Sequence, residues 1–191
     1  MHTPEDVLLS RLSAGVNYDT RTVYIIGDVD HELARKAIVA LEVMDATPGD
    51  IRVILSSYGG EEFAGYAIHD AILMCKNTVI VDGYGAVMSI AAAVFMAGDV
   101  RRLAPNCELM VHNGTIDSEA NVEQDSVIEL AEQIKKDCKK YYAILSYGSK
   151  QPISLIKDWC RDSTHFTAKE AVAIGFADSI LKPTKKKGKK K

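Results

Sequence analysis

The sequence has few of the features that mark secreted, metal-binding or membrane proteins. Its 191 residues include only four cysteines, widely spaced and without a CxxC pair, which argues against a disulfide framework and a zinc site. The longest apolar stretch, residues 86–97, is too short to cross a bilayer. The opening segment MHTPEDVLLSRL carries acidic residues and no continuous apolar core, unlike a secretory signal. We therefore expect a cytoplasmic protein with reduced cysteines and no membrane association.

Basic residues are concentrated at the C-terminus. The segment KKKGKKK at 185–191 holds six of the 23, and the remaining 17 face 26 acidic residues, a net charge of −9. An acidic body without aromatic and basic residues interleaved argues against a nucleic-acid-binding domain. The tail itself is expected to be a disordered, solvated end over 183–191, although a contact with nucleic acid or an acidic partner stays open.

Strand-like and helix-like segments alternate along the chain. Apolar strands are expected at 22–29, 51–57 and 78–85, short ones at 100–105, 107–112 and 176–181, and helices between them. The longest helix is expected at about 119–147, with others at 6–12, 31–45, 62–75, 89–98, 152–160 and 167–174. This alternation predicts one α/β domain over 1–182 with a largely parallel sheet, whose ligands would bind at the carboxyl ends of the strands.

One hydroxyl stands alone in the apolar run GYGAVMSIAAAVFMAGD at 83–99. Ser89 follows a strand and a glycine turn and begins a helix, where nearby N–H groups lie at the positive helix end. Two interpretations are open: a serine that caps the helix, which is common, or a nucleophile. The stretch by itself favours the cap.

Two other places offer the partners that a nucleophilic serine needs. Gly59 and Gly60 follow a strand, where the backbone can approach a ligand and donate N–H groups, although a plain tight turn is the better explanation of the pair taken alone. His112 ends the apolar strand CELMVH and is the best candidate base among five histidines, although a lone histidine there is more often structural.

Four motifs in register resemble the proteolytic subunit of the Clp protease family (ClpP). They are SSYGG at 56–60, the block around Ser89, LAPNCELMVH at 103–112 and FTAKEAVAIGFADSIL at 166–181. The resemblance covers residues 6–181 and implies a ClpP/crotonase-like spiral of strand–helix repeats with a long handle helix. It implies a serine endopeptidase in which Ser89 is the nucleophile, His112 the general base, and the N–H groups of Gly60 and Ile90 the oxyanion hole.

The third catalytic position departs from the family pattern. The family's aspartate falls on Ser163 here, with Asp162 immediately before it. A one-residue shift would let Asp162 orient His112; otherwise Ser163 or a water would do so, with Asp158 a more remote choice. Tyr58 also replaces a proline, and NGTIDSEA after His112 replaces the family's glycine-rich strand, which bears on substrate preference and on contact between rings.

The resemblance further implies heptameric rings, two of them stacked, that receive unfolded polypeptide from an AAA+ unfoldase and need no cofactor or metal. Two other functions stay open at this point. Ser163 suggests a catalytically weak structural subunit of a mixed ring. A crotonase-type acyl-CoA enzyme shares the spiral and the backbone oxyanion hole but does not need Ser89 and His112 together.

Overall fold

The computed structural model describes residues 15–114 and 124–182. The helix predicted at 6–12 and the lysine-rich tail lie outside these residues. No helix in the described ranges combines the length and the apolarity that a bilayer crossing requires.

An eight-stranded sheet forms the centre of the molecule. Its main path runs β1-β2-β3-β4-β5-β8, and β6 pairs with β4 and with β7. The pairings are parallel except for β1 with β2 and β6 with β7, as the alternating pattern predicts for most strands. The strands are β1 Val16–Asn17, β2 Thr22–Ile26, β3 Ile51–Ser57, β4 Val79–Met88, β5 Val100–Leu103, β6 Glu108–Val111, β7 Thr164–Thr167 and β8 Ser179–Ile180.

The helices and strands follow the predicted order, with small changes at their ends and one additional strand. The strand predicted at 22–29 ends earlier, that at 78–85 continues to Met88, and β7 was not predicted. β7 has the sequence THFT, in which Phe166 is the one apolar residue, so it lacks an apolar strand pattern. The described helices are α2 His31–Asp45, α3 Glu62–Met74, α4 Ile90–Met96, α5 Gln124–Ser149, α6 Ile153–Arg161 and α7 Ala168–Ala173.

Helix α4 lies in the middle of the core, and every one of its residues is buried. A helix that is apolar on all sides needs neighbours on all sides. It packs against α3, where Gly65 allows close approach: a Cβ at that position would lie 2.2 Å from Cγ1 of Ile90. The start of α4 is thereby held firmly against α3 and the end of β4.

A buried carboxylate links three neighbouring strands. Asp82 on β4 is fully buried, and its oxygens accept hydrogen bonds from Nε of Arg52 on β3 (2.6 Å) and from Nε (2.6 Å) and Nη2 (2.8 Å) of Arg102 on β5. A buried charge is tolerated when it is paired and hydrogen-bonded in this way. The cluster fixes β3, β4 and β5 relative to one another.

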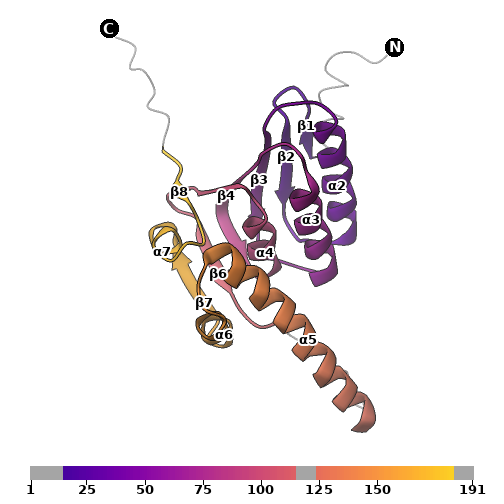
Figure 1. Cartoon of the computed structure of the whole chain (residues 1–191), viewed down its shortest axis with the longest axis vertical. Helices are drawn as coiled ribbons and strands as arrows, with labels where there is room; N and C mark the ends of the chain where they lie inside the picture. Colours follow the sequence, from indigo (N-terminus) through magenta and orange to yellow (C-terminus); the bar gives the residue numbers. More distant parts are fainter. Residues whose placement is uncertain (1–14, 115–123, 183–191) are drawn as a thin grey trace.

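Figure 1 shows the N-terminal part of α5 projecting away from the rest of the molecule. The C-terminal part of this 26-residue helix packs on the body, where Tyr141, Tyr142 and Leu145 are buried. The long handle helix expected from the sequence is therefore present. Its described part begins at Gln124, and the start expected at about 119 falls among residues 115–123, outside the described ranges.

Candidate active site

Ser89 and His112 meet where two parallel strands end. Ser89 follows the last residue of β4, and His112 follows the last residue of β6. These strands pair in register through Met88 and Met110, so their carboxyl ends lie side by side. Oγ of Ser89 lies 2.8 Å from Nε2 of His112, a hydrogen-bond distance, and the Ser89 N–H donates to the Met110 carbonyl at 2.9 Å.

Ser89 occupies the cap position of α4 but does not act as a cap through its side chain. No side-chain capping bond is made there, and the hydroxyl is directed to the histidine instead. The backbone at Ser89 has φ 56° and ψ −130°, a conformation that costs a non-glycine residue about 1–3 kcal/mol. A strained turn between a strand and a helix, with an exposed Oγ, is the arrangement used by nucleophilic serines.

Tyr141 on α5 supports this strained turn from the side. Its hydroxyl donates to the Ser89 carbonyl at 2.9 Å, and the ring is buried. Burial raises the pKa of Tyr141 well above its usual value, so the hydroxyl remains a donor. The sequence analysis did not identify this contact, because two residues 52 positions apart leave no local signal.

The glycine pair after β3 approaches Ser89 closely. A Cβ at Gly59 would lie 2.6 Å from Cβ of Ser89, and one at Gly60 would lie 2.3 Å from the Val29 carbonyl oxygen. Their φ angles of 114° and 147° also disfavour other residues. Glycine is therefore required at both positions by the close contacts as well as by the backbone angles, whereas a plain turn would require only the angles.

Val29 holds this glycine segment in an extended conformation. The Val29 N–H donates to the Gly59 carbonyl at 2.8 Å, and the Glu61 N–H donates to the Val29 carbonyl at 2.7 Å. In a parallel bridge of this kind, the N–H of the central residue, Gly60, points away from the bonded partner. The N–H of Ile90 belongs to the first turn of α4, where no carbonyl of the helix can accept it.

His112 is partly buried. Burial lowers its pKa below the usual 6.5 because the imidazolium ion loses hydration. The neutral ring, which can accept a proton from Ser89, is thus the stable form at neutral pH.

The structure does not bring Asp162 to His112. The β6–β7 register pairs Val111 with Thr164, and continuing this antiparallel register by one residue places Ser163 opposite His112. The hydrogen bonds of the described residues do not link Asp162 to His112. The Asp162 carboxylate lies 3.1 Å from Nε of Arg161, and its side chain is 62% exposed.

Ser163 departs from ordinary backbone geometry at this position. Its φ is +50°, and its N–H donates to the Cys160 carbonyl at 3.4 Å. The same carbonyl accepts the N–H of Asn113 at 3.0 Å, and the Asn113 side chain accepts the Tyr142 hydroxyl at 2.6 Å. The end of α6 is therefore tied to the residue that follows His112. Asp158, the more remote candidate for orienting His112, accepts a hydrogen bond from Nη1 of Arg161 at 2.8 Å.

A serine hydroxyl on a strained strand–helix turn, bonded to a half-buried neutral histidine, defines a serine hydrolase site. Comparisons with known proteins agree. The family model for Clp protease matches residues 11–184. ATP-dependent Clp protease proteolytic subunits are 32% identical over 165 residues in Streptococcus mutans (84% of each chain) and 34% over 172 residues in Ligilactobacillus salivarius (87% of this chain, 85% of that one).

Solved structures give the same answer. The structure of a ClpP1 mutant from Listeria monocytogenes superimposes with a TM-score of 0.80 at 27% identity, covering 92% of this chain and 96% of that one. The chain belongs to the Clp protease family. The predicted ClpP-like fold and the assignment to a serine endopeptidase of this family are confirmed. The two alternatives, a crotonase-type enzyme and a catalytically weak structural subunit of a mixed ring, are not favoured.

The lowered pKa of His112 predicts where activity falls in acid. Because protonated His112 cannot accept the Ser89 proton, the acid limb should follow the histidine of the free enzyme. We expect its midpoint below pH 6.5, measured as the rate of Ser89 labelling by a fluorophosphonate across pH 4–8. A midpoint above 6.5 would show that a carboxylate stabilises the imidazolium and would contradict this environment.

Proposed function

We propose that Ser89 attacks the carbonyl carbon of a peptide bond while His112 accepts its proton. The observation that carries this proposal is the 2.8 Å contact between Oγ of Ser89 and Nε2 of His112. His112 then donates that proton to the leaving amine, which departs from the acyl-enzyme. Water, deprotonated by His112, hydrolyses the ester in the second half and restores the Ser89 hydroxyl.

The N–H groups of Gly60 and Ile90 are proposed as the oxyanion hole. The Val29 bridge leaves the Gly60 N–H facing away from Val29, and the Ile90 N–H lies at the start of a helix, next to the nucleophile. Donors that are fixed before the reaction stabilise the charge that develops on the carbonyl oxygen without reorganising. The packing of Gly65 against Ile90 contributes this rigidity.

The substrate is proposed to be unfolded polypeptide delivered by an AAA+ unfoldase in the cytoplasm. The curated relatives are named ATP-dependent proteolytic subunits, which supports an ATPase partner on a separate chain. An extended, unfolded chain presents its backbone carbonyls to the Ser89 site, whereas a folded substrate does not.

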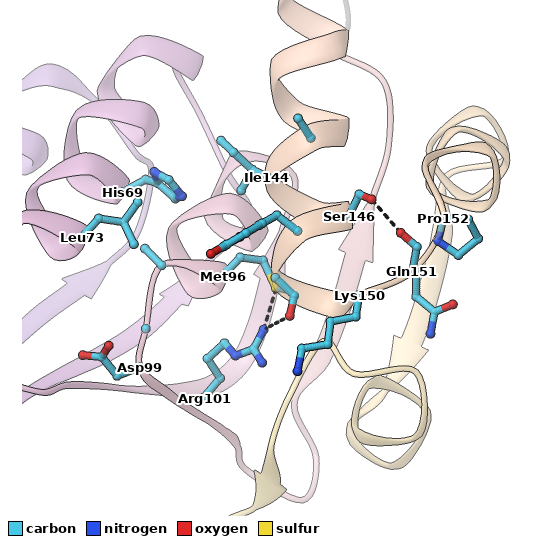
Figure 2. Close-up of a pocket in the computed structure, with 15 residues that line it drawn as sticks. His69, Leu73, Met96, Asp99, Arg101, Ile144, Ser146, Lys150, Gln151 and Pro152 are labelled. Carbon is cyan, nitrogen blue, oxygen red and sulfur yellow. Dashed lines mark hydrogen bonds between the residues drawn. The ribbon is translucent and has the colours of Figure 1, made fainter.

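We further propose that the chain assembles into heptameric rings that stack in pairs. A hollow of about 1060 Å³, open at the surface, lies between the ends of α3, α4 and α5. Figure 2 shows His69 and Leu73 on one side of it and Lys150 and Pro152 on the other. Tyr147 lines the same hollow with 89% of its surface exposed, which supports a contact with a neighbouring subunit.

The nucleophile is tested by labelling with a fluorophosphonate followed by intact mass. We expect one phosphonate per chain in the wild type and none in Ser89→Ala, because no other described serine contacts a histidine base. His112→Ala should slow labelling by about 10³-fold or more, since a serine hydroxyl without its base is a weak nucleophile. Labelling of Ser89→Ala at the wild-type rate would contradict the proposal.

The orienting role of Asp162 stays a prediction, and Asp162→Asn tests it. An orienting carboxylate is worth about 10⁴ in kcat in the well-known serine proteases. Because this carboxylate is exposed and bonded to Arg161, we expect Asp162→Asn to lower kcat less than about tenfold. Asp158→Asn, which also removes a carboxylate from Arg161, is the matched control. A loss near 10⁴ with Asp162→Asn alone would instead establish its role.

The proposed ring contact is tested with Tyr147→Glu. Placing a carboxylate in a closed interface leaves it without water, so we expect the assembly to dissociate into smaller species. Light scattering after size-exclusion chromatography measures the mass. The control is Ser154→Glu, at an exposed position of α6 outside the hollow. It adds the same charge and should keep the wild-type mass. An unchanged mass for Tyr147→Glu would place the subunit contact elsewhere.

A further inference from the structure

Glu62 borders the cavity that contains Ser89 and His112. The cavity is lined by Glu62, Ser89, Ile90, His112, Gly114 and Tyr141. Glu62 is the first residue of α3 and follows Gly60 by two positions. A Cβ at Gly114 would lie 3.3 Å from Oε1 of Glu62, so the carboxyl group is next to the backbone two residues beyond His112. The mechanism described above does not use this carboxyl group.

The charges around Glu62 leave the cavity negative. Asp137 and Lys140, both on α5, face Glu62 and have opposite effects: Asp137 raises its pKa and Lys140 lowers it. The Lys140 ammonium also lies 4.6 Å from the ring centroid of Tyr66. Since Asp137 and Lys140 offset each other, and His112, Tyr66 and Tyr141 are neutral at pH 7, ionised Glu62 contributes the remaining charge.

The neighbouring carboxylate of Glu61 has a different environment. It lies 3.1 Å from Nε2 of His31, with both side chains more than half exposed, and it does not line the cavity. An exposed pair of this kind is screened by water and contributes little. Two adjacent glutamates therefore differ in one respect that matters here: only Glu62 faces the nucleophile.

We propose that Glu62 determines substrate preference, favouring lysine or arginine at the residue whose carbonyl Ser89 attacks and disfavouring aspartate or glutamate there. This inference rests on the proposed peptidase function. A peptide held with its carbonyl carbon at Ser89 places the adjoining side chain next to this cavity, whose free volume of about 20 Å³ holds a water molecule but not the side chain itself. A cationic group there pairs with Glu62 in surroundings that exclude part of the water, whereas an acidic group meets a like charge.

Two fluorogenic peptides that differ only in lysine or norleucine before the cleaved bond test the inference on the assembled full-length protein. The two side chains share an unbranched four-carbon chain, and lysine adds the charged ammonium group. We expect kcat/KM to favour lysine by about tenfold in the wild type, and Glu62→Gln to remove this preference while norleucine cleavage changes less than about twofold. Glu61→Gln, the matched control, should keep the wild-type ratio. A ratio that Glu62→Gln leaves unchanged, or an equal fall for both peptides, would overturn the inference.

The same ratio has a predicted pH dependence. Burial, with a smaller contribution from Asp137, raises the pKa of Glu62 above its usual 4.5. The preference for lysine should therefore decline as pH falls through that raised value, because protonated Glu62 is neutral. The His112 titration affects both peptides equally and cancels in the ratio. A preference that persists after Glu62 is protonated would contradict the assignment.

Fluorophosphonate labelling of the same preparations separates the two proposals. Labelling at Ser89 together with peptide cleavage that lacks the lysine preference overturns the inference about Glu62 alone. A wild type that neither labels nor cleaves either peptide overturns the proposed function, and the inference with it.

Discussion

The hydrogen bond between Ser89 and His112 is the constraint around which the rest of the site is arranged. It requires the carboxyl ends of β4 and β6 to lie side by side, and the parallel register through Met88 and Met110 provides this. It also requires a sharp change of direction at Ser89, from strand to helix, with a positive φ. Neither condition is a local property of residues 83–99, because β6 is contributed by a segment twenty residues later in the chain.

Surrounding groups offset the strain that this geometry creates. Tyr141 donates to the Ser89 carbonyl, the Ser89 N–H is bonded to β6, and α4 begins against Gly65 with every residue buried. A conformation that costs about 1–3 kcal/mol persists only where its surroundings impose it. Such strain at a serine whose hydroxyl is bonded to a histidine is itself a sign that the residue is used in chemistry.

Sequence reasoning recovered the parts of the site that depend on order and spacing. Strand–helix alternation predicts the parallel sheet, and the glycine pair after β3 predicts a close approach of the backbone, which Gly59 makes to Ser89. Sequence reasoning did not identify Tyr141 or Glu62, because their places at the site come from packing between α3, α5 and the end of β4. The third catalytic position shows a second limit. The family spacing assigns it to Ser163, and the β6–β7 register, continued by one residue past Val111 and Thr164, gives the same residue. Whether a neighbouring carboxylate reaches His112 depends on side-chain packing, which spacing does not describe.

A crystal structure of the protein with a fluorophosphonate bound to Ser89 tests the central claim most directly. The phosphonyl oxygen takes the place of the oxyanion. The account predicts that this oxygen lies within about 2.7–3.1 Å of the backbone nitrogens of both Gly60 and Ile90, with His112 still next to Ser89. An oxygen directed to solvent, or a phosphonate on another residue, would contradict it.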